Sequence, residues 1–115
     1  MLIAEDDANV RLTLEFVLED EGFEVLHAED GEEALNLALS LQPHAILLDQ
    51  LMPKMNGKQV FSALRQDDAT KAIPVFVLSG MQRRSDDEWA GAQFVGKPFA
   101  PDELVKMIRS AIDRH

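Results

Sequence analysis

The sequence predicts an α/β protein with a doubly wound, five-stranded parallel sheet and helices on both faces. Two observations predict this fold. Short apolar runs alternate along the chain with segments whose apolar residues recur at helical spacing. The runs at 45–48 and 75–78 are apolar throughout, as expected of strands that are buried on both faces. Because strands that alternate with helices are joined by right-handed crossovers, they form one parallel sheet.

Two helices separate the first three predicted strands. We expect these strands at Leu2–Ala4, Phe23–Ala28 and Ala45–Leu48. One face of the first helix is apolar and consists of Val10, Leu14, Val17 and Leu18. Gly22 ends this helix, and Asp30 can cap the second one. The inner face of the second helix consists of Ala34, Leu37, Ala38 and Leu41.

A third helix, a fourth strand and a short fourth helix follow. The residues that mark the third helix are Gly57, Val60, Phe61 and Leu64. Pro74 opens the fourth strand, which runs to Leu78. Ser85 and Glu88 have the spacing of a capping box, so we expect a short helix that starts there and ends by Gly91.

The chain ends with a strand at Phe94–Gly96 and a helix that Pro101 opens. The inner residues of this helix are Leu104, Val105, Ile108 and Ile112. Strand order cannot be read from one sequence, but the flavodoxin-like order 2-1-3-4-5 fits this length. Ligands bind such sheets outside the carboxyl ends of the strands. With 115 residues, the chain is long enough for one domain, 1–115, with one core.

The composition excludes several classes of protein. The net charge of −10 and the scattered basic residues argue against direct nucleic-acid binding, which needs clustered lysine and arginine. The absence of cysteine excludes a disulfide framework, a thiolate nucleophile and a thiolate metal site. Residues 1–4 lead straight into acid, and no apolar run approaches membrane-spanning length. We therefore expect a soluble, cytoplasmic protein without membrane contact.

Polar side chains follow four of the predicted strands at the point where each strand ends. They are Glu5, Asp6 and Asp7 after the first strand, Asp49 after the third, Ser79 after the fourth and Lys97 after the fifth. The carboxyl ends of parallel strands meet at one edge of the sheet. Carboxylates, a hydroxyl and an ammonium group at that edge are suited to binding a divalent cation and a phosphoryl group.

The residues around these positions resemble the receiver domain of bacterial two-component response regulators. The matching stretches are LIAEDD, LLDQLMPKMNG, PVFVLSG and FVGKPF, at the first, third, fourth and fifth strands. Any one stretch is a weak indication, but four of them in the family's order form a specific pattern. The resemblance extends over nearly the whole chain.

The resemblance implies that Asp49 is the phosphoacceptor. A carboxylate can attack phosphorus to give an acyl phosphate when the charges of both groups are offset. Lys97 can pair with Asp49 and then with a phosphoryl oxygen, and Ser79 would donate a hydrogen bond to the phosphoryl group. Phe94 occupies the position of an aromatic residue that swings inward in the family's conformational switch. Simple core packing fits Phe94 as well.

The resemblance also implies a metal site, and Mg²⁺ (or Mn²⁺) suits oxygen ligands and a phosphate partner. Counting back from Arg11, as family sequences align, places the acidic pair at Glu5 and Asp6. Asp6 is then the direct ligand, Glu5 can act through water, and Asp7 is a helix-capping residue. The implied ligands are therefore Asp6, Glu5, Asp49 and the backbone carbonyl of Leu51.

One segment departs from the family pattern. The stretch from Ser79 to Lys97 is about one helical turn shorter than we expect for the family. The deficit falls on the fourth helix, which is shortened to little more than 86–90. The surface that this helix commonly contributes to dimerisation and output in relatives must therefore differ here.

As a receiver, the domain would take a phosphoryl group from a histidine kinase or a histidine phosphotransfer protein. It would then change shape to control a downstream protein or a fused output domain that the sequence does not specify. It would catalyse only its own phosphorylation and dephosphorylation and is not otherwise an enzyme. The alternative is a receiver-like protein-binding module that signals without phosphorylation. Against this alternative stands the intact set of Glu5, Asp6, Asp49, Ser79 and Lys97.

Overall fold

The computed structural model describes residues 1–49, 55–79, 92–96 and 100–113. Five strands form one sheet in the order β2-β1-β3-β4-β5, and all neighbouring strands are parallel. The strands are β1 (Leu2–Ala4), β2 (Leu26–Ala28), β3 (Ile46–Asp49), β4 (Val75–Ser79) and β5 (Gln93–Gly96). The predicted flavodoxin-like strand order is confirmed.

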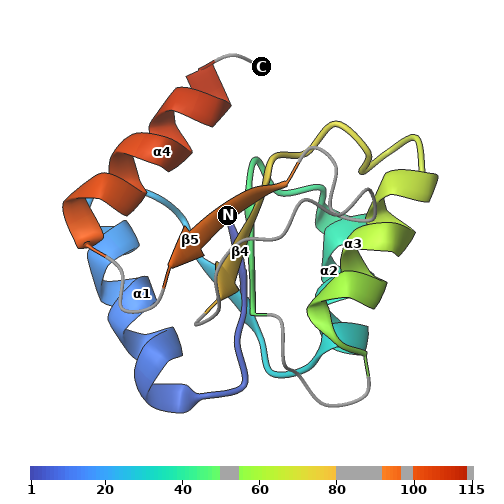
Figure 1. Ribbon diagram of the computed structural model, residues 1–115, viewed down its shortest axis with the longest axis horizontal. Helices are drawn as coiled ribbons and strands as arrows, with labels where there is room; N and C mark the ends of the chain where they lie inside the picture. Colours follow the sequence, from blue (N-terminus) through green and yellow to red (C-terminus); the bar gives the residue numbers. More distant parts are fainter. Residues whose placement is uncertain (50–54, 80–91, 97–99, 114–115) are drawn as a thin grey trace.

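Helices cover both faces of the sheet, with α1 and α4 on one face and α2 and α3 on the other (Figure 1). The helices are α1 (Ala8–Asp20), α2 (Gly31–Leu41), α3 (Gly57–Gln66) and α4 (Pro101–Asp113). The doubly wound arrangement is therefore as predicted. The short helix predicted to start at Ser85 lies outside the described residues. Within the described part of the chain, no helix has the length and apolar character of a membrane span.

Each face of the sheet has its own hydrophobic core, because successive residues of a strand point to opposite faces. In β1, Leu2 and Ala4 belong to the core under α2 and α3, whereas Ile3 belongs to the core under α1 and α4. Leu47 of β3 lies on the same side as Ile3. This burial on both faces explains why the central strands are apolar throughout.

β2 is shorter than the sequence predicts, because it begins at Leu26 and not at Phe23. The amide of Gly22 donates to the carbonyl of Glu19, and the amide of Phe23 donates to that of Leu18, both at 3.0 Å. Gly22 has a positive φ of 93°, so these two bonds form a Schellman motif that closes α1. Phe23 therefore belongs to the end of the helix, and strand pairing starts only at Leu26.

Candidate functional site

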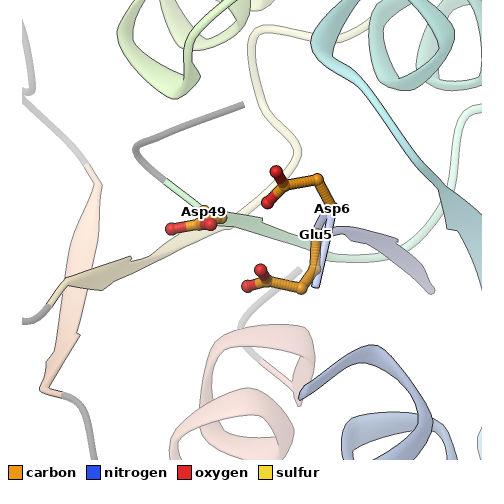
Figure 2. A group of neighbouring side chains, drawn as sticks. All are labelled: Glu5, Asp6 and Asp49. Atoms are coloured by element: carbon orange, nitrogen blue, oxygen red, sulfur yellow. The ribbon is translucent and has the colours of Figure 1, made fainter. Parts of the chain in front are cut away.

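Three carboxylates from two neighbouring strands meet at the carboxyl edge of the sheet. Glu5 and Asp6 directly follow β1, and Asp49 is the last residue of β3. One carboxylate oxygen from each of the three lies within 4.8 Å of the others. Figure 2 shows Glu5 and Asp6 extending from the end of one strand toward the side on which Asp49 lies. The structure thus brings together the three acidic side chains that the sequence assigns to the metal.

The three acids differ in their exposure to solvent. Glu5 is 1% exposed and Asp49 is 8% exposed, whereas Asp6 is exposed. Burial disfavours a carboxylate unless hydrogen bonds or a cation compensate, and neighbouring carboxylates repel each other. A cation among the three would offset both costs. The exposed Asp6 lies where such a cation can arrive from solvent.

Hydrogen bonds hold the turn that leads from β1 to α1. The Glu5 amide donates to the Ala28 carbonyl at 3.2 Å, and the Asp7 amide donates to Glu5 Oε1 at 3.2 Å. The Asp7 carboxylate accepts from the amides of Asn9 and Val10 at 2.9 and 3.4 Å. Asp7 is therefore the N-cap of α1, as its position in the sequence predicts. Its carboxylate serves the helix and is not among the three clustered ones.

Arg11 makes a further contact to this turn. Its Nη1 atom donates to the backbone carbonyl of Glu5 at 2.9 Å, and its side chain is only 11% exposed. Its Nη2 atom lies 3.8 Å from Glu29 Oε1. In the sequence analysis, Arg11 only aligns the acidic pair. Its contact to the turn cannot be predicted, because a bond from a side chain to a backbone carbonyl leaves no periodic signal in the sequence.

The start of α2 packs closely against the residue that precedes the N-cap of α3. A Cβ atom added to Gly31 would lie 1.9 Å from the carbonyl oxygen of Met55, so only glycine fits without a shift of this backbone. Asn56 caps α3 in a capping box with Gln59. These contacts fix the point at which the chain enters α3 after leaving the strand that ends at Asp49.

The remaining predicted site residues are described only in part. Ser79 is the last residue of β4, and its Cα is in register with that of Gly96 in β5. Lys97 and Leu51 lie outside the described residues. Phe94 is half-buried and packs against the core under α2 and α3. The sheet register thus places Ser79 beside the strand end that leads to Lys97.

The donor set of the cluster fits a hard divalent cation. Carboxylate oxygens are ligands that Mg²⁺ and Mn²⁺ accept readily, and Mg²⁺ keeps waters and a phosphate oxygen in its remaining positions. Of the three converging carboxylates, two are buried and one is exposed to solvent. Asp49 can also act as a nucleophile toward phosphorus. The site is therefore compatible with metal-assisted phosphoryl transfer to a carboxylate.

Comparison with known proteins identifies the family of this chain. The family model for the response regulator receiver domain matches residues 1–109. The phosphate regulon transcriptional regulatory protein PhoB of Escherichia coli K12 is 35% identical over 118 residues, which cover 99% of this chain and 52% of PhoB. The chain spans about half the length of the curated relatives it matches.

Solved structures of similar proteins have the same fold as this chain. One is the receiver domain of the sensor histidine kinase PA1611 from Pseudomonas aeruginosa PAO1, which has a magnesium ion coordinated in its active-site cleft. It superposes with a TM-score of 0.89 at 26% identity and covers 97% of this chain and 95% of that one. The chemotaxis protein CheY4 of Vibrio cholerae gives a TM-score of 0.87 at 29% identity, with 96% and 95% covered.

Proposed function

Because this chain belongs to the response regulator receiver domain family of two-component systems, we propose that Asp49 accepts a phosphoryl group from a histidine kinase or a histidine phosphotransfer protein. Residues 1–115 act as one receiver domain in this proposal. The observation that carries it is the convergence of Glu5, Asp6 and Asp49 within 4.8 Å. A signalling role, and not that of a classical enzyme, fits the family.

Asp49 is the nucleophile in this reaction. One carboxylate oxygen forms a bond to phosphorus while the bond from phosphorus to the donor's histidine nitrogen breaks, which gives an acyl phosphate and a free imidazole. Asp49 ends a buried strand and is 8% exposed, so its position is fixed and its contact with bulk water is limited. Both features favour attack on a phosphoryl group that is presented at the sheet edge.

Mg²⁺ or Mn²⁺ is the cofactor that these residues fit. Asp6 and Asp49 would hold it directly, Glu5 would act through water, and the Leu51 carbonyl would add a further oxygen. When bound, the ion supplies positive charge that offsets the charges of Asp49 and of the incoming phosphoryl group.

Ser79 and Lys97 respond to the transferred group. Ser79 donates a hydrogen bond to the phosphoryl group, and Lys97 pairs with one of its oxygens. Contacts that form only after phosphorylation shift a pre-existing equilibrium between two conformations. Phe94 takes part in this switch or remains a core residue. The switched cytoplasmic domain controls a downstream protein or a fused output domain through protein contacts and does not itself bind nucleic acid.

The test is phosphorylation of the isolated chain by acetyl phosphate in the presence of Mg²⁺. Intact-mass spectrometry should show one added phosphoryl group, which a chelator and Asp49→Asn should each abolish. Asp68→Asn is the matched control, because Asp68 is an exposed acid that pairs only with Lys71 in the described structure. It should leave phosphorylation unchanged.

Two results would contradict the proposal. A phosphoryl group that still forms on Asp49→Asn would place the acceptor elsewhere. No mass change in the wild type, with acetyl phosphate or with a histidine kinase as donor, would favour the receiver-like module that signals by protein contact alone.

A further inference from the structure

Arg11 occupies an unusual electrostatic position. It is the only lysine or arginine among residues 1–33, a stretch with 12 aspartate and glutamate residues. Its side chain is nevertheless 11% exposed and not spread over the acidic surface. Nη1 donates to the carbonyl of Glu5 at 2.9 Å, directly at the peptide that joins Glu5 to Asp6. The guanidinium group therefore contacts the backbone of the acidic turn.

With this contact, every polar group of Glu5 has a role in the turn. The Glu5 amide donates to Ala28 of β2, its carbonyl accepts from Arg11 of α1, and its carboxylate accepts from the Asp7 amide. The peptide between Glu5 and Asp6 is thus held from the sheet and from the helix. Loss of the guanidinium group would remove the contact from α1. The side chains of Glu5 and Asp6 would then be less firmly oriented.

Charge and geometry make opposite predictions for this residue. A cation near a metal site repels the metal, so charge alone predicts that removal of Arg11 strengthens Mg²⁺ binding. If Arg11 instead fixes the direction of the ligands, its removal weakens Mg²⁺ binding, because ligand orientation is lost. The sign of the change therefore separates the two roles.

We propose that Arg11 is a positioning residue for the metal site, an inference that rests on the proposed function of the acidic cluster. It orients the peptide between Glu5 and Asp6 so that both carboxylates converge on Asp49 before any metal binds. The second guanidinium contact is minor. Glu29 is 72% exposed and its Oε1 lies 3.8 Å away, so solvent screens this pair.

The test compares Arg11→Met with Arg65→Met by calorimetric titration of Mg²⁺. Arg65 is the matched control, because it also donates to a backbone carbonyl, that of Lys71, and stacks 4.7 Å from the Phe61 ring centroid. It lies in the last turn of α3, away from the acidic turn. We expect Arg11→Met to weaken Mg²⁺ binding about tenfold, as is typical for residues that orient metal ligands. Arg65→Met should leave it unchanged.

Several outcomes would overturn the proposal. Equal or tighter Mg²⁺ binding by Arg11→Met would leave only the charge effect. An equal loss in Arg65→Met would point to general destabilisation. If Arg11→Met does not fold, Arg11→Lys replaces it, since lysine keeps the charge but lacks the planar fork. Affinity for Mg²⁺ in Arg11→Lys at or above that of the wild type would also overturn the proposal.

A measurement without metal separates this inference from the proposed function. Hydrogen exchange in the presence of a chelator reports the amides of Glu5 and Asp7, whose bonds define the turn. We expect both to exchange faster in Arg11→Met and at the wild-type rate in Arg65→Met. Unchanged exchange in Arg11→Met would refute the positioning role. A wild type that fails to bind Mg²⁺ would instead contradict the proposed metal site and leave the exchange result to decide Arg11.

Discussion

The two ends of β1 and β3 differ in character. Three carboxylates lie at the carboxyl ends of these strands, whereas a cleft of about 560 Å³ lies at their amino ends. The lining of the cleft is largely apolar and includes Met1, Phe23, Leu26, Leu41, Pro43 and Ile112. At this end, cationic donors bind backbone carbonyls. The Met1 ammonium donates to Glu24 at 2.6 Å, and Arg109 Nη2 donates to Glu21 at 2.7 Å.

The direction of the helices accounts for this difference. The helices that follow β1, β2 and β3 begin at the carboxyl ends of the strands and finish at the amino ends. The first amides of a helix carry partial positive charge and the last carbonyls partial negative charge. In α1, the Asp7 carboxylate binds the first amides, and Arg109 binds the Glu21 carbonyl at the opposite end. The fold thus favours anions at the end where Asp49 lies.

The largest effect is expected at Asp6, at the carboxyl ends of the strands. Asp6→Asn removes one of the three clustered charges, and we expect Mg²⁺ affinity to fall by about 100-fold or more, since residues one step further out already cost 10- to 100-fold. Without metal, the free energy of unfolding should stay the same or rise, because repulsion within the cluster falls. Calorimetric titration of Mg²⁺ and urea unfolding in a chelator measure the two quantities.

Asp7→Asn is the matched control for this prediction. Asparagine caps a helix as well as aspartate does, so the variant removes a neighbouring charge and keeps the turn. Its Mg²⁺ affinity should remain close to that of the wild type. Equal losses in Asp6→Asn and Asp7→Asn would mean that the net acidity of the edge, and not the three converging ligands, decides binding.

A second, smaller effect is expected at Gly31, the first residue of α2, which lies at the carboxyl ends of the strands. Gly31→Ala places a Cβ 1.9 Å from the Met55 carbonyl oxygen, and such overpacking costs about 1–3 kcal/mol of unfolding free energy. Urea unfolding followed by circular dichroism measures it. Gly96→Ala is the control, because a Cβ there has no neighbour within 4 Å among the described residues. A neutral Gly31→Ala would show that α3 can shift away without loss.

The smallest effect is expected at the amino end. The sequence pattern predicts Leu41 on the inner face of α2, but it is 55% exposed at the cleft. Leu41→Gln should therefore change the free energy of unfolding by no more than about 0.5 kcal/mol and leave Mg²⁺ affinity unaltered. Thermal unfolding and the same titration measure both. A large loss of stability would mean that the cleft is a packed part of the core, and the contrast between the two ends would weaken.

The sheet could be predicted from the sequence because burial on both faces leaves continuous apolar runs. The same signal was misleading at Phe23, an apolar residue directly before a strand. There, the Schellman bonds of α1 compete with strand pairing and hold Phe23 at the helix end. Composition does not distinguish these two uses of an apolar residue.

The acidic cluster was only partly predictable. Three consecutive acids follow β1, and their side-chain types do not say which one caps the helix. The hydrogen bonds from Asn9 and Val10 to Asp7 answer that question. The bond from Arg11 to the Glu5 carbonyl joins residues six positions apart across a turn, and no periodic pattern encodes it. The roles assigned to Ser79 and Lys97 stay predictions from the sequence.

The bond from Arg109 to the Glu21 carbonyl joins positions 88 residues apart, and this separation has a consequence for synthesis. A ribosome adds roughly 5–20 residues per second from the amino terminus. The strands that carry the three carboxylates are complete at Asp49, long before the last helix emerges. A nascent chain that stops short of α4 would therefore contain Glu5, Asp6 and Asp49 but leave the α4 side of its sheet partly uncovered. Such a chain is a substrate for chaperones and proteases before it can become a signalling protein.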